Sequence, residues 1–187
     1  METIKRLSTR DLERVRFAKG VLAPKGHIYY PTYIPTDIDW ERAIVKAIKK
    51  TCSDMLAPVP IIGVRGMRMV ARAILKWPSK HGIPKTNFYL AQMVRMQEEI
   101  GTGGGGFRYI YSAFLQEASK KINNPQLLEL SVEMTAIGDL WRDFAVEASR
   151  VYKKRSNQTD VYTKLSEALV HLSNLEEAFF KKLKKAV

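Results

Sequence analysis

A repeating alternation of three- and four-residue steps between apolar positions constrains this chain more than any other feature. It is clearest before residue 152, where eight apolar residues follow the alternation without a break: Leu127, Leu130, Met134, Ile137, Trp141, Phe144, Ala148 and Val151. This spacing places the side chains on one face and predicts a long amphipathic α-helix. Asn124 followed by Pro125 is a typical helix start, an N-cap residue and then proline in the first turn.

A second long helix is predicted after the polar stretch at residues 153–160. Its apolar positions are Val161, Leu165, Ala168, Leu172, Leu175 and Phe179. Because the connection is short, we expect the two helices to be antiparallel neighbours. Gly138 lies inside the first helix, where glycine costs about 1 kcal/mol relative to alanine, and this predicts close packing around it.

The rest of the chain also has helical spacing, apart from residues 20–37. That segment contains three prolines and clustered aromatic residues, so we expect an extended segment laid across the helices. Shorter helices are predicted at about 8–19, 39–55, 65–77, 86–99 and 107–118, with Asp37 or Asp39 opening the second of these. We therefore predict an all-α, bundle-like single domain over 1–187, with about six helices, one extended N-terminal segment and a glycine-rich helix–loop–helix.

Composition narrows the cellular setting and the class of partner. No apolar stretch approaches the roughly 20 residues of a membrane span, and the first residues lack a secretory signal. A lone cysteine, Cys52, fits a reducing compartment, so a cytoplasmic protein without membrane contact is expected. The net charge of +12, from 31 basic and 19 acidic residues, favours acidic partners.

The positive charge is concentrated on one predicted helix. Arg65, Arg68, Arg72 and Lys76 are spaced three or four residues apart and share one face, and no acidic residue lies between Met55 and Gln97. This basic face either lies in solvent or meets an acidic surface. An acidic protein would fit, and so would nucleic-acid phosphate, although no nucleic-acid recognition motif accompanies the face.

Five of the eleven glycines lie between residues 101 and 106. Gly101-x-Gly103-x-x-Gly106 formally matches the dinucleotide fingerprint, but a helix and not a strand is predicted before it. Phe107 and Arg108 stand where a Walker loop has lysine and serine or threonine. Nucleotide binding is therefore not indicated.

Two interpretations of the glycine run stay open. The glycines permit a tight reversal with close helix contact, or they present unobstructed N–H groups to a ligand near a positive helix N-terminus. The ligand site of the second interpretation would comprise Gly101, Thr102, Gly103, Gly104, Gly105, Gly106, Arg108, Tyr111 and Glu98. Glu98 would orient an amine or act as a base, unless it is a solvated surface charge.

The stretch "GTGGGGFRYIYSAFLQEA" at 101–118 resembles the signature of the C-terminal helical domain of the butirosin-biosynthesis acyltransferase (BtrH-like) family. "LSTRDLERVRFAKG" at 7–20, "GVRGMRMVARAILKWP" at 63–78 and "LWRDFA" at 140–145 resemble it too. In that family a papain-like domain precedes the helical one. The resemblance implies acyl transfer from an acyl carrier protein thioester to an amine, and this chain begins where the papain-like domain would end.

No catalytic group is assigned within the chain. Cys52 shares a helix face with Ile44 and Ile48, which favours a buried, inert thiol. The three histidines have no metal-ligand spacing, so no metal is expected. No resident cofactor is expected either, and the resemblance implies a phosphopantetheine-borne acyl group as substrate. We expect a recognition domain of a BtrH-like acyltransferase that is inactive alone and meets a carrier protein or a separate papain-like domain. The alternative is a non-catalytic helical module that dimerises or binds acidic macromolecules.

Overall fold

The computed structural model describes residues 6, 8–20, 23–101, 103–155 and 160–187. These residues contain seven α-helices, one short 3-10 helix and no β-strand. The all-α prediction is confirmed, and each of the predicted helical ranges forms a helix, which gives seven helices among these residues against the expected total of about six. Contacts divide the chain into two compact units, Met1–Ile38 and Asp39–Val187. The single domain over 1–187 stays a prediction.

The N-terminal unit contains one short helix, α1 (Thr9–Arg16). The Ser8 hydroxyl accepts a hydrogen bond from the Asp11 amide at 3.1 Å, which satisfies a free donor at the helix start. After the helix, the Arg16 guanidinium donates to the Gly26 carbonyl oxygen at 2.6 Å. Residues 23–38 form no helix or strand, so the non-helical N-terminal segment is confirmed. Its placement across the helices stays a prediction.

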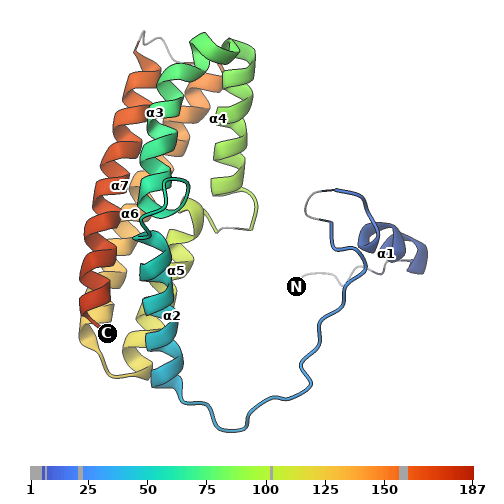
Figure 1. Ribbon diagram of the computed structural model, residues 1–187, viewed down its shortest axis with the longest axis vertical. Helices are drawn as coiled ribbons and strands as arrows, with labels where there is room; N and C mark the ends of the chain where they lie inside the picture. The colour runs from blue at the N-terminus through green and yellow to red at the C-terminus, as the bar shows by residue number, and fades with distance from the viewer. Residues whose placement is uncertain (1–5, 7, 21–22, 102, 156–159) are drawn as a thin grey trace. The chain divides into compact units, whose positions relative to one another are not determined.

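The second unit is a bundle built on two long antiparallel helices (Figure 1). The shorter helices α2 and α3 lie one after the other along α7, and α4 and α5 lie one after the other along α6. Each pair resembles one long helix that is broken in the middle, and the glycine run forms the break between α4 and α5. The elements are α2 (Trp40–Met55), α3 (Gly63–His81), α4 (Ile83–Glu98), η1 (Gly105–Phe107), α5 (Arg108–Lys121), α6 (Pro125–Tyr152) and α7 (Val161–Lys185).

The apolar face of α6 forms the centre of the core, as predicted. Seven of its eight apolar positions are buried and Val151 is half-buried. The helix starts where the sequence indicated, because the Asn124 side chain accepts from the Gln126 amide at 3.1 Å and Pro125 occupies the first turn. Leu165, Leu172 and Phe179 of α7 are buried in the same core. Because α6 and α7 are in contact and run in opposite directions (Figure 1), the antiparallel pairing is also confirmed.

The helices on either side of the glycine run form, and their buried faces combine apolar and polar residues. Met96, Phe107 and Ile110 are more than half exposed. The buried positions are Thr86, Leu90, Val94 and Gln97 in α4, and Ser112, Leu115, Ala118 and Ser119 in α5. Polar groups are tolerated there because they are bonded: the Ser112 hydroxyl, for example, donates to the Ser131 carbonyl oxygen at 2.7 Å.

None of the helices in the described ranges is both long enough and apolar enough to cross a membrane.

Candidate functional site

The glycine run joins α4 to α5 through an unusual backbone path. Gly101 and all four glycines at 103–106 have positive φ, between 55° and 83°, and Phe107 follows with φ 72°. Residues with a Cβ rarely adopt these angles, because Cβ then crowds the neighbouring carbonyl oxygen. The local backbone path therefore accounts for all five glycines without a ligand. Thr102 lies outside the described residues.

Close contact with α6 adds a second reason for glycine. A methyl group on Gly105 would lie 3.2 Å from the Gly138 carbonyl oxygen and 3.1 Å from the Tyr109 ring. A methyl group on Gly138 would lie 2.9 Å from the same ring, which confirms the close packing predicted there. The Tyr109 hydroxyl donates to the Asp139 carboxylate at 2.7 Å and keeps the ring in place.

The last turn of α4 ties this loop to α6. Glu98 accepts from the Gly105 amide at 3.0 Å and from the Gln97 side chain at 2.9 Å. The Gln97 amide also donates to the Trp141 carbonyl oxygen at 2.6 Å. Arg142 Nε lies 3.7 Å from the second Glu98 oxygen. The Glu98 carboxylate thus already occupies the place of an anion at the loop.

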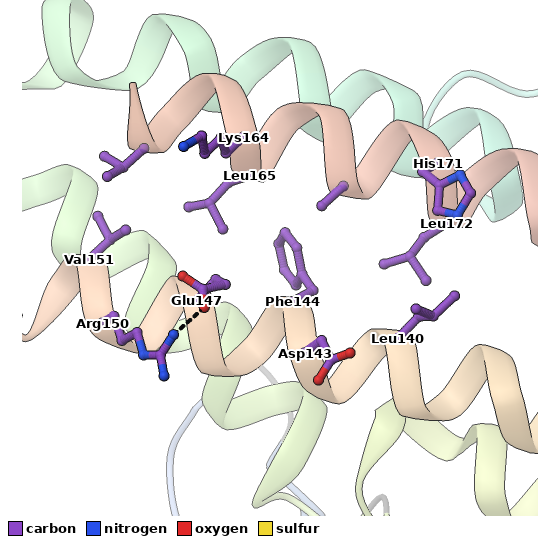
Figure 2. Close-up of a pocket in the computed structure, with 12 residues that line it drawn as sticks. Leu140, Asp143, Phe144, Glu147, Arg150, Val151, Lys164, Leu165, His171 and Leu172 are labelled. Atoms are coloured by element: carbon purple, nitrogen blue, oxygen red, sulfur yellow. Dashed lines mark hydrogen bonds and ion pairs between the residues drawn. The ribbon is translucent and has the colours of Figure 1, made fainter. Parts of the chain in front are cut away.

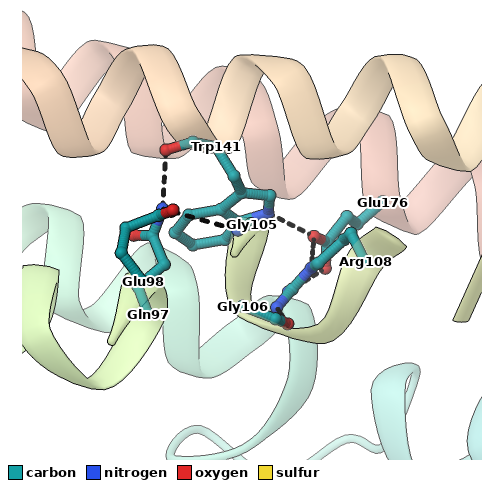
Figure 3. Close-up of polar contacts among 7 residues, drawn as sticks. All are labelled: Gln97, Glu98, Gly105, Gly106, Arg108, Trp141 and Glu176. Carbon is teal, nitrogen blue, oxygen red and sulfur yellow. Dashed lines mark hydrogen bonds and ion pairs between the residues drawn. The ribbon is translucent and has the colours of Figure 1, made fainter. Parts of the chain in front are cut away.

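A buried ion pair holds the start of α5 (Figure 3). Arg108 donates to both carboxylate oxygens of Glu176, at 2.7 and 2.9 Å, and Glu176 is completely buried. The Trp141 indole N–H donates to the same carboxylate at 2.6 Å, while the Arg108 guanidinium lies 4.7 Å from the Trp141 ring centroid. Arg108 also donates to the Gly106 carbonyl oxygen. Such a forked, multiply bonded pair compensates for the burial of both charges.

These contacts bear on the proposed ligand cradle. Its two main donors, the Gly105 amide and the Arg108 guanidinium, are both bonded to carboxylates of the protein itself. The hypothesis of an anion held by this loop is weakened accordingly. A ligand in this part of the bundle is better sought beside the loop than on the loop amides.

A pocket does lie beside the loop, between α2, α5, α6 and α7. It has a volume of about 160 Å³, and we call it the Tyr111 pocket. It is lined by Thr51, Met55, Gly106, Phe107, Arg108, Tyr111, Met134 and Phe180. Three of the predicted site residues therefore meet here: Gly106, Arg108 and Tyr111. Gly101, Gly103 and Glu98 do not line it. The Tyr111 hydroxyl is buried, and burial raises the pKa of Tyr111, so the phenol stays neutral.

Sequence reasoning missed Glu176, the partner of Arg108. A signal was present, because Glu176 stands four residues after Leu172 and three before Phe179, in the middle of the apolar face of α7. A charged residue in such a position needs a buried partner of opposite charge.

The basic face is divided by its own contacts. Arg68 donates to the Asn174 side chain at 2.8 Å and forms an ion pair with Glu177, both on α7. Arg65 donates to the Pro58 carbonyl oxygen at 3.3 Å and is exposed. Arg72 and Lys76 are exposed and have no acidic partner in the described part of the chain. The face available to a partner therefore comprises Arg65, Arg72 and Lys76.

The ion pair between α3 and α7 gives a prediction for acid. Hydrogen bonds from Lys181 and Arg68 lower the pKa of Glu177 to about 2. A carboxyl group whose pKa is lowered by folding stabilises the folded state when the pH is above the pKa of that group in the unfolded chain. This contribution is lost as the pH falls toward the folded-state pKa. Glu177→Gln removes this ion pair and should therefore lower the free energy of unfolding at pH 7. The expected loss is only about 1 kcal/mol, because solvent screens the pair.

Urea titrations between pH 7 and pH 2 measure this effect. The difference between wild type and Glu177→Gln should shrink below about pH 4.5 and vanish near pH 2. Glu167→Gln, an exposed change on the same helix, is the control. A difference that is constant over the whole range would show that the Glu177 pKa is not lowered.

Other candidate groups are accounted for by packing. Cys52 is completely buried, and burial raises the pKa of its thiol. The described residues include no group of three or more histidine, cysteine, aspartate and glutamate side chains that could hold a metal ion.

A further hollow, of about 310 Å³, lies between α6 and α7 (Figure 2). Phe144, Leu165 and Leu172 point into the space between the two helices. The Arg150 side chain is paired with Glu147 on its own helix. This crevice between the helices has a mixed lining, because its apolar residues are accompanied by Asp143, Glu147, Arg150, Lys164 and His171.

A protein-family model matches residues 10–183, and its description is "Domain of unknown function (DUF4872)". The chain belongs to this family. No curated protein and no solved structure matches the chain. The matched part of this DUF4872 chain includes the glycine run, the Arg108–Glu176 pair, the Tyr111 pocket and the basic face.

Proposed function

We propose that this chain is a helical recognition domain of a BtrH-like acyltransferase, inactive alone, which binds the acyl part of a thioester-borne substrate. The observation that carries the proposal is the Tyr111 pocket beside the glycine run. The most specific part of the family resemblance, residues 101–118, contributes Gly106, Phe107, Arg108 and Tyr111 to its lining.

The chemistry of the pocket suits an acyl chain better than an anion. Met55, Met134 and Phe180 give it a mainly apolar lining, and the Arg108 charge is already balanced by Glu176. Removing apolar surface from water then supplies the binding energy, about 0.8 kcal/mol for each buried CH₂ group. A volume of about 160 Å³ is below the roughly 300–1,000 Å³ of pockets for drug-sized ligands, so a short acyl group is expected.

The partners follow from the same proposal. A separate papain-like domain would supply the nucleophile for transfer to an amine, as the resemblance implies. An acidic carrier protein would meet Arg65, Arg72 and Lys76, which are exposed on α3. A cytoplasmic location belongs to this proposal and stays a prediction.

Filling the pocket should weaken binding of the acyl group. Thr51→Leu adds apolar volume to the pocket wall, whereas Thr163→Leu makes the same change at an exposed position on α7. Isothermal titration calorimetry with butyryl-pantetheine compares the variants with the wild type. We expect binding to weaken by about tenfold or more in Thr51→Leu, because the added side chain displaces the ligand, and to be unchanged in Thr163→Leu.

Either of two results would contradict the proposal. One is the absence of binding to the wild type at millimolar butyryl-pantetheine. The other is equal affinity in the wild type and Thr51→Leu, which would place the ligand elsewhere. Circular dichroism of both variants establishes that they are folded before the comparison is made.

A second candidate function is a non-catalytic module that binds acidic macromolecules or a second copy of itself. The exposed Arg72 and Lys76 side chains, without acidic partners in the described residues, favour it. Nucleic acid is one such macromolecule. This function needs only the basic face and no Tyr111 pocket, so the Thr51→Leu experiment separates the two.

A further inference from the structure

Another hollow lies where the end of α4 meets the C-terminal half of α6. Its volume is about 320 Å³. Its lining residues are Val94, Glu98, Arg142, Ala145, Val146, Ser149, Arg150, Lys153 and Arg155. It shares none of them with the Tyr111 pocket. Val94, Ala145 and Val146 form an apolar surface, and four cationic side chains surround it.

The positive charge of this hollow exceeds its negative charge. Glu98 is its only carboxylate among the lining residues, and that group already accepts from the Gly105 amide and from Gln97. Arg142 lies 3.7 Å from Glu98, a loose contact at an exposed side chain. The Glu98 carboxylate therefore cannot neutralise all the cationic side chains that line the hollow.

The remaining cations are available to a ligand. Arg150 pairs with Glu147, but both side chains are about half exposed, and an exposed pair of this kind is easily exchanged. Lys153 and Arg155 have no acidic partner in the described part of the chain. The Lys153 ammonium lies 5.6 Å from the Tyr152 ring centroid, a contact that leaves its charge unbalanced.

We propose that this hollow binds a small phosphate monoester that carries an apolar substituent. Guanidinium groups donate to phosphate oxygens in a fork, and an ammonium adds a compact charge, so a dianion would satisfy several of these side chains at once. The surface of Val94, Ala145 and Val146 would take the substituent. The volume of about 320 Å³ lies at the lower end of the range for small-molecule sites. This proposal does not depend on the proposed acyl recognition.

The test uses n-butyl phosphate as the probe and the full chain, in calorimetric titrations at low salt. Lys153→Gln/Arg155→Gln removes two cations from the hollow. Lys46→Gln/Lys49→Gln removes two exposed cations from α2 and is the matched control. We expect the first variant to bind about tenfold more weakly than the wild type and the control to bind like the wild type.

A third variant and two further probes test the apolar surface and the class of anion. Val146→Ala should weaken binding of n-butyl phosphate and leave binding of inorganic phosphate unchanged. Butyrate, a monoanion of similar length, should bind much more weakly than n-butyl phosphate. The proposal is overturned if n-butyl phosphate does not bind, if the control variant loses as much affinity as Lys153→Gln/Arg155→Gln, or if butyrate binds equally well.

Discussion

Glu176→Ala is expected to destabilise the bundle by about 3–5 kcal/mol, the largest effect of any single change considered for this protein. The substitution removes the buried acceptor of three hydrogen bonds, two from Arg108 and one from Trp141. The Arg108 guanidinium would then be a mostly buried charge without its counter-charge. The start of α5 and the glycine run, which Arg108 joins to α7, should lose their order first.

Urea unfolding followed by far-UV circular dichroism measures this effect. Glu177→Ala, at the next and partly exposed position, should cost about 1 kcal/mol. The double variant Arg108→Met/Glu176→Met should be more stable than Glu176→Ala, because apolar residues replace the whole buried pair and leave no charge unpaired. A loss in Glu176→Ala no greater than in Glu177→Ala would mean that the pair does not hold the fold.

Gly105→Ala is expected to cost about 2–4 kcal/mol, while Gly101→Ala costs only about 1 kcal/mol. Both positions have positive φ, 57° and 64°, so the backbone penalty is similar. The difference lies in the space available. A methyl group at Gly105 meets the Gly138 carbonyl oxygen at 3.2 Å, whereas nothing lies within 4 Å of one at Gly101.

Thermal and urea unfolding of the two variants test this comparison directly. Gly105→Ala should also distort the Tyr111 pocket, because the loop that it displaces contains Gly106 and Phe107, which line the pocket. Equal, small losses in both variants would indicate that the loop moves freely at Gly105. In that case the loop would not be packed closely against α6.

The long helices could be predicted from the sequence because their burial is purely apolar. In α6, the apolar positions from Leu127 to Ala148 are all buried, and Asn124 with Pro125 marks the start of the helix. Apolar periodicity reports the buried face directly when apolar side chains do the packing.

The buried polar positions of α4 and α5 could not be predicted in this way. Gln97 and Ser112 are buried because α6 offers them hydrogen-bond partners, the carbonyl oxygens of Trp141 and Ser131. Phe107, in contrast, stays exposed at a left-handed position just before α5. Such partners come from residues far away in the sequence, so a local apolar pattern does not reveal them.

The candidate site was predicted in part. Arg108 and Tyr111 do line a pocket next to the glycine run, but the sequence could not show that a buried glutamate 68 residues away binds the arginine. The five glycines suggested exposed amides for a ligand. The structure instead relates them to positive φ and to the close approach of Gly105 to Gly138.

An acyl group is expected to bind in the Tyr111 pocket. Methionine residues report on this site, because Met55 and Met134 line the pocket while Met69 and Met96 are exposed elsewhere. The measurement is a titration of ¹³C-methyl-methionine-labelled protein with butyryl-pantetheine, followed by NMR. Binding in the pocket predicts saturable shifts of the Met55 and Met134 methyl signals and none for Met69 and Met96. Unchanged Met55 and Met134 signals at saturating ligand, or shifts confined to Met69 and Met96, would contradict it.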